Sequence, residues 1–242
     1  MPPPCLSVRR LTTLSSAASS VHRGTAFEHW SMQVLHTCLS MSLSRVGGRA
    51  DGGVDLQGWW WLPSQGNSLG APPIRRRIRV LAQCKAEKKK IGPKYVREME
   101  GVLHQFNASM ALLGPHPEAP ADWCVDDESP RSPTVGMFIS NSPFTQMALT
   151  RALSSSLPLA LLYLPIPVAE LLPKEQLSDS DDGPSVRPDA IGSVVFNSAL
   201  GGTSGILEGE IEPRWEYPTK PGGIGRPMLW WQGRRLPSYS PS

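Results

Sequence analysis

This 242-residue chain has 40% hydrophobic residues and a net charge of +3, which suits the core of one medium domain with additions or of two small domains. It has no run of 18 apolar residues, so the sequence predicts no transmembrane helix and no integral membrane association. Its four cysteines are widely spaced and form no Cys-x-x-Cys pair, which argues against a zinc ribbon and a disulfide framework.

Residues 1–23 have the composition of a mitochondrial presequence. They are rich in Ser, Thr, Ala and Leu, contain Arg9, Arg10 and Arg23, and lack Asp and Glu. A cationic, weakly amphipathic start of this kind is typical of import into mitochondria, and the lack of a long apolar stretch speaks against a secretory signal. We therefore expect a protein of the mitochondrial matrix; an ordinary unstructured N-terminus is the alternative.

The first helix of the folded part is predicted over residues 25–46. Thr25 is a suitable N-cap, and Glu28, three residues on, completes a capping box. The helix is predicted to end at Gly47-Gly48. Apolar residues recur at helical spacing through it: Phe27, Trp30, Val34, Leu35, Cys38, Leu39 and Met41.

Two strands are predicted next, over residues 54–62 and 77–84, joined by a loop at 64–73. Asp55 leaves a glycine-rich turn at the head of the first strand. Residues i and i+2 of a strand share a face, so Gln83 and Lys85 project together while Cys84 faces away. If the two strands pair, Asp55 joins them. A carboxylate, an amide oxygen and an ammonium group together could hold a divalent cation beside a phosphate.

The remaining elements complete a mixed α/β sheet with helices on its faces, in the order helix, strand, strand, helix, strand, helix, strand. After residue 165 the signal weakens to a polar linker, two candidate edge strands and a tail rich in Pro and Gly. We expect three parts: residues 1–23, a domain over 24–165, and an extension over 166–242. The later elements are a helix opening at Pro93, a strand at 134–140, a helix at 144–156, a strand at 157–164, and the edge strands at 191–196 and 206–215.

A basic segment over residues 75–97 holds ten Lys and Arg residues against one acid, Glu87. Lying beside the Gln-x-Lys strand, it is a candidate surface for a polyanion, although a solvated charged loop is the simpler interpretation. The candidate nucleic-acid contacts are Arg75, Arg76, Arg77, Lys88, Lys89 and Lys90.

Five blocks in order resemble the Mrr-type branch of the restriction-endonuclease-like superfamily, over roughly residues 24–165. The closer resemblance is to fungal mitochondrial proteins called required for respiratory growth, which carry this nuclease-like domain. The blocks are Gly24-Thr25-x-Phe27-Glu28, the stretch from Gly47 to Asp55, Gln83-Cys84-Lys85, the stretch from Arg97 to Gly101, and the stretch from Gly136 to Thr145 followed by Ala148.

The resemblance implies a restriction-endonuclease-like fold and a metal-dependent nuclease using Mg²⁺ or Mn²⁺. Asp55 would be the metal-binding acid and Gln83 a ligand through its side-chain oxygen. Lys85 would steady the attacking water or the developing charge, and Glu28 would be an outer acid of the metal site. Gln83 stands where the common pattern has a second acid, which lowers the negative charge available to the metal.

Simpler interpretations remain for each of these residues. Asp55 could cap the glycine turn, with Asp51 as the rival acid, and Lys85 could be one more solvated lysine. Glu100 is expected to form a surface ion pair with Arg97 or Lys94 rather than to act in a site. In the run of residues 59–61, two tryptophans are expected in the core and one exposed, with stacking on bases as the alternative.

The sequence therefore predicts a mitochondrial phosphodiesterase acting on nucleic acid, DNA rather than RNA, that supports genome maintenance or respiratory growth. The first alternative is a catalytically inactive nuclease-fold protein that binds nucleic acid or assists assembly. The second is a structural protein whose basic loop contacts membrane phospholipid.

Overall fold

The computed structural model describes residues 9–46, 52–63, 75–112, 132–165, 191–217, 225–236 and 239, with residues 9–21 described only as helical backbone. Several predicted features lie outside these residues: the end of the first helix at Gly47-Gly48, the rival acid Asp51, the loop at 64–73 and the polar linker after residue 165. In the described residues, no helix is long and apolar enough to cross a membrane.

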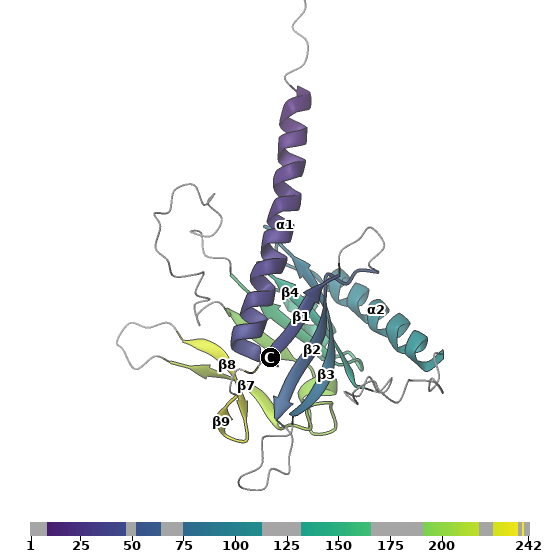
Figure 1. The fold of residues 1–242 in the computed structure, drawn as a ribbon, viewed down its shortest axis with the longest axis vertical. Coiled ribbons are helices and arrows are strands. Elements are labelled where there is room, and N and C mark those ends of the chain that lie inside the picture. The colour runs from purple at the N-terminus through teal and green to yellow at the C-terminus, as the bar shows by residue number, and fades with distance from the viewer. Residues whose placement is uncertain are drawn as a thin grey trace, which may run out of the picture.

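A six-stranded mixed sheet forms the centre of the fold, in the order β1-β2-β3-β4-β5-β6 (Figure 1). The pairs β3/β4 and β4/β5 are parallel and the other three pairs are antiparallel. This confirms the predicted mixed α/β architecture. The elements are α1 (Arg9–Leu39), β1 (Met41–Arg45), β2 (Leu56–Pro63), β3 (Arg75–Lys85), α2 (Pro93–Leu112), β4 (Thr134–Ser140), α3 (Gln146–Leu153), β5 (Leu159–Tyr163) and β6 (Ser193–Phe196).

The predicted first helix is wrong at both ends. It begins at Arg9, so Thr25 lies inside α1 and does not cap it. It ends at Leu39, and Ser40 follows with a positive φ of 59° that breaks the helix. The next five residues form β1, which pairs antiparallel with β2. Their alternation of apolar and polar residues has the period of a strand, and pairing with β2 decides in its favour.

Each face of the sheet has its own apolar core. On one face α1 packs through Phe27 and Val34 against the strands. On the other face α2 and α3 pack through Met99, Leu103 and Ala148. Strand β3 is buried on both sides, because Val80, Ala82 and Cys84 belong to the α1 core while Leu81 belongs to the α2 core. By the same alternation Gln83 and Lys85 face the α2 side.

The three consecutive tryptophans of β2 differ from prediction, since only the middle one is fully buried. Trp60 is 0% exposed, whereas Trp59 and Trp61 are half-buried. Trp59 lies beneath the guanidinium groups of Arg77 and Arg79, at 4.3 and 4.5 Å from its ring centroid. The flanking tryptophans are therefore covered by neighbouring side chains at the sheet surface rather than by the core.

The C-terminal residues complete the α1 core. The predicted edge strand at 191–196 corresponds to β6, but the second predicted strand does not pair with it. That segment overlaps β7 (Ile211–Glu216), which joins β8 (Arg226–Trp231) and β9 (Arg234–Arg235) in a separate three-stranded antiparallel sheet. Ile211, Leu229 and Leu236 of this part belong to the same buried cluster as Phe27 of α1. A short helix, α4 (Ser198–Gly201), follows β6.

Replacing Gly58 with alanine is expected to destabilise the protein by about 2–3 kcal/mol or more. A Cβ at this position would lie 2.1 Å from the backbone oxygen of Ser42 in β1, so β1 and β2 could not keep their pairing. Urea denaturation would measure the loss. Gly92→Ala is the control, because nothing lies within 4 Å of a Cβ there. Equal stability of the two variants would contradict the close approach of β1 and β2.

Candidate functional site

Asp55 connects the ends of three strands. Its backbone N–H donates to the carbonyl oxygen of Ala82 in β3, and its own carbonyl accepts from the N–H of Val46 after β1, both at 2.9 Å. Its Oδ2 accepts a hydrogen bond from the backbone N–H of Cys84 at 2.7 Å. The carboxylate therefore reaches across to β3, beside the peptide bond that joins Gln83 to Cys84.

Glycine is required in the turn before Asp55. Gly52 and Gly53 have positive φ angles of 61° and 86°, which side chains rarely tolerate. A Cβ at Gly53 would also lie 3.7 Å from Nε2 of Gln83. The turn thus passes directly over the Gln83 amide and closes one side of the candidate site.

Gln83 carries a buried acceptor without a partner. Its side chain is 7% exposed, and its Oε1 has no hydrogen-bond partner among the described residues. Leaving such an oxygen unsatisfied costs about 1–3 kcal/mol. A hard cation would satisfy it, since Mg²⁺ takes carboxylate and amide oxygens and otherwise keeps water or substrate phosphate as ligands. Asp55 and Gln83 therefore fit the donor set of such an ion.

Among the described residues, no three His, Cys, Asp or Glu side chains gather closely enough to hold a metal ion. A cation held by Asp55 and Gln83 would have the Asp55 carboxylate and the neutral amide oxygen of Gln83 as its ligands from these two residues. Substrate phosphate and water would have to supply other ligands, as is usual for Mg²⁺.

Lys85 is half-buried at the end of β3, and its Nζ lies 5.9 Å from the ring centroid of Tyr95 on α2. The Tyr95 hydroxyl donates a 2.6 Å hydrogen bond to Glu87. In the described part of the chain Lys85 makes no ion pair within 4 Å. Its ammonium charge is therefore not neutralised by an ion pair with a described acid.

The hydrogen bond to Glu87, together with burial, raises the pKa of Tyr95 to about 12. The folded protein therefore keeps the Tyr95 hydroxyl protonated to a higher pH than the unfolded chain does. This contribution to stability is present below about pH 10 and is lost as pH rises toward 12. We expect Glu87→Gln to return the pKa of Tyr95 toward its ordinary value. Tyrosinate absorbance titration of the parent and the variant measures the change, with Tyr95→Phe identifying the signal. An unchanged titration would contradict the role of Glu87.

Glu28 lies on α1, where its Oε2 accepts a 2.7 Å hydrogen bond from Nε of Arg45 in an ion pair. Burial raises the pKa of the Cys84 thiol, and the carboxylates of Asp55 and Glu28 raise it further, while Ser31 and Lys85 lower it. Glu28 as an outer acid of a metal site remains a prediction, and its observed partner is Arg45.

The basic segment does not form one patch beside the site. Arg75 and Arg76 begin β3, and at about 3.3 Å per residue they lie roughly 30 Å along the strand from Lys85. The Arg75 guanidinium stacks 3.9 Å from the ring centroid of Tyr239, and Arg76 forms ion pairs with Glu208 and Glu210. Lys88, Lys89 and Lys90 follow Lys85 directly and are exposed. Lys94 of the same segment lies over the Tyr95 ring, as Lys85 does, with its Nζ 6.0 Å from the ring centroid.

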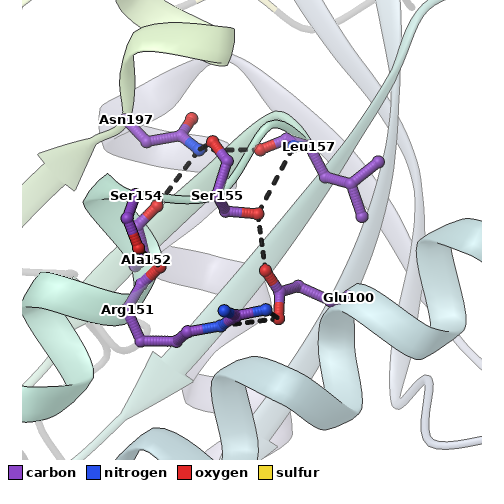
Figure 2. A network of polar contacts seen from close by, with 7 residues as sticks. All are labelled: Glu100, Arg151, Ala152, Ser154, Ser155, Leu157 and Asn197. Atoms are coloured by element: carbon purple, nitrogen blue, oxygen red, sulfur yellow. Dashed lines mark hydrogen bonds and ion pairs between the residues drawn. The ribbon is translucent and has the colours of Figure 1, made fainter.

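Sequence reasoning misjudged Glu100, which is 7% exposed and pairs with neither Arg97 nor Lys94. Figure 2 shows Glu100 of α2 pointing toward Arg151 of α3 and toward Ser155, which follows that helix. Arg151 donates to its Oε2 through Nε at 3.0 Å and also through Nη2, and the Ser155 hydroxyl donates to its Oε1 at 2.7 Å. The sequence did hold a signal that Glu100 is buried, because it lies on the same helix face as the apolar stripe of α2. The buried residues of α2 are Val96, Met99, Glu100 and Leu103.

Residues 19–76 and 65–113 match the protein family described as Required for respiratory growth protein 7. These residues include Glu28, Asp55, Gln83 and Lys85. The chain is also 40% identical over 91 residues to an uncharacterized mitochondrial protein of Schizosaccharomyces pombe, covering 38% of this chain and 33% of that protein. The chain thus matches a third of the relative's length. These similarities support the relation to respiratory-growth proteins and confirm the predicted mitochondrial location.

One solved structure with some likeness is the MspJI restriction endonuclease in complex with a 27-mer oligonucleotide. The two chains are 18% identical, and the match covers 65% of this chain and 30% of the endonuclease chain, with a TM-score of 0.34. A likeness this slight bears on neither a superfamily nor an activity. The relation to restriction endonucleases therefore remains a prediction. The matrix compartment is also still a prediction.

Proposed function

We propose that this protein is a mitochondrial metal-dependent nuclease that hydrolyses phosphodiester bonds in nucleic acid and thereby supports respiratory growth. The observation that carries the proposal is the 2.7 Å hydrogen bond from the Cys84 N–H to Asp55, beside the buried, unpartnered Oε1 of Gln83. This bond holds the Asp55 carboxylate against β3 at the residue that follows Gln83.

In this proposal Asp55 and Gln83 hold Mg²⁺ or Mn²⁺. Such an ion supplies polarisation of the phosphoryl oxygen and lowers the pKa of a bound water. Lys85 adds positive charge next to the phosphate, where negative charge develops in the transition state. The ring of Tyr95 lies beside the Lys85 ammonium and limits the space in which it moves. Lys88, Lys89 and Lys90 extend the positive charge along the path of the substrate backbone.

The test is cleavage by the purified full chain. Plasmid DNA and a structured RNA are incubated with Mg²⁺, with Mn²⁺, and with either ion plus a chelator. We expect cleavage, preferentially of DNA, that requires the ion and stops on chelation. Cleavage that continues in chelator would contradict a metal-dependent site, and full inertness toward both polymers would contradict the enzyme.

The second candidate is a nuclease-fold protein without catalysis that binds nucleic acid or assists assembly. It is favoured by the amide of Gln83 in place of a second acid and by the engagement of Glu28 with Arg45. Salt-sensitive binding of DNA without scission in either ion would select this candidate. Preference for anionic vesicles over both polymers would instead select a membrane-contacting protein.

A further inference from the structure

An open pocket of about 490 Å³ lies between α2 and the end of α3, and no part of the proposed nuclease mechanism uses it. It is lined from α2 by Arg97, Gly101 and His104, and from the other side by Arg151 and residues 154–157. Its volume falls within the range of small-molecule sites, about 300–1,000 Å³. Glu100 also lines it, and Figure 2 draws the network of polar contacts that Glu100 makes.

The hollow follows from the sequence of one helix face. Arg97, Gly101 and His104 stand at positions i, i+4 and i+7 of α2 and therefore share that face. Gly101 leaves a gap between the two long side chains. Glycine inside a helix costs about 1 kcal/mol relative to alanine, yet nothing lies within 4 Å of a Cβ placed there. No neighbouring atom in the described residues requires the glycine, and the space above it stays open.

The charge of the pocket is positive. The Glu100 carboxylate is engaged on both oxygens, by Ser155 and by the Nε and Nη2 of Arg151. This fixes the Arg151 guanidinium through Nε and Nη2, while the side chain, which lines the pocket, remains 44% exposed. Arg97 is exposed and forms no ion pair within the described residues. The charge of Arg97 is therefore not balanced by a described acid.

We propose that this pocket binds a phosphate group through Arg97, His104 and the guanidinium edge of Arg151 that Glu100 does not use. The planar donor fork of arginine matches phosphate geometry, and a guanidinium already held by a carboxylate loses little freedom on binding. The inference does not rest on the nuclease proposal, because Asp55, Gln83 and Lys85 do not line this pocket.

Calorimetric titration of the full chain with inorganic phosphate tests the inference. We expect saturable binding that Arg97→Gln weakens about tenfold or more. Lys94→Gln is the matched control, since Lys94 lies on the same helix outside the pocket and is paired with Glu98. Gly101→Leu should abolish binding by filling the gap, while Gly101→Ala should retain it. Absence of binding by the parent, or equal affinity in all four variants, would overturn the proposal.

Two further probes separate the sources of the phosphate. Displacement by a single-stranded oligonucleotide with a 5′-phosphate, but not by the same strand with a 5′-hydroxyl, would assign the pocket to a nucleic-acid end. Displacement by AMP alone would assign it to a small phosphorylated ligand. Asp55→Asn is expected to bind phosphate like the parent, so failure of the nuclease proposal and failure of this one give different results.

Discussion

Asp55→Asn is expected to lower metal-dependent cleavage by about 100-fold or more while leaving the fold intact. The asparagine oxygen can still accept the hydrogen bond that Cys84 donates at 2.7 Å. The negative charge is lost, however, and with it the single carboxylate of the Asp55–Gln83 pair. Initial rates on a labelled duplex in Mg²⁺ measure the effect, and the unfolding midpoint of each variant verifies the fold.

Lys85→Met should reduce the same rate without weakening the metal requirement, because its charge acts on the phosphate. Lys89→Met is the matched control, since Lys89 is exposed and lies in the loop beyond β3. That variant should weaken binding of the substrate slightly and leave the rate at saturation near that of the parent. Cleavage by Asp55→Asn at the parental rate would show that scission comes from another site or from a contaminant.

Asn197→Ala is expected to lower the free energy of unfolding by about 3–4 kcal/mol. Asn197 is 2% exposed and joins α3, β5 and α4 through one side chain. Its removal leaves buried backbone groups without partners, which costs more than the bonds contribute. Its Oδ1 accepts from the N–H groups of Leu159 and Leu200, and its Nδ2 lies within 3.2 Å of the carbonyl oxygens of Ala152, Ser155 and Leu157.

Urea denaturation followed by far-ultraviolet circular dichroism measures the loss. Asn107→Ala is the control, because Asn107 is exposed on α2 and alanine favours a helix there. A midpoint for Asn197→Ala close to that of the control would mean that the network around residues 152–159 does not hold the end of α3 in place.

Local patterns in the sequence were sufficient to predict most of the central fold. The stripe from Phe27 to Leu39 gave the buried face of α1, and the alternation around Val80 gave β3. The i, i+2 rule placed Gln83 and Lys85 on one face, and Asp55 does reach β3 beside them. Whether these three residues act on a metal and a phosphate remains a prediction.

Partners distant in the chain could not be predicted. Arg76 meets Glu208 and Glu210 more than 130 residues away, and nothing local distinguishes it from a solvated arginine. The partner of Glu100, Arg151, is likewise 51 residues on. The strand β1 was missed for a related reason: five residues carry little pattern of their own, and β2 supplies the pairing that defines them.

The buried cluster that unites Phe27 of α1 with Leu236, more than 200 residues later, has a consequence for biogenesis. A nascent chain emerges from the ribosome N-terminus first, and domains usually fold as units. The apolar face of α1 therefore remains without its last partners until Leu236 has been synthesised. During that interval the exposed stripe invites aggregation, so a holding chaperone would have to shield it until the segment that carries Leu236 has emerged.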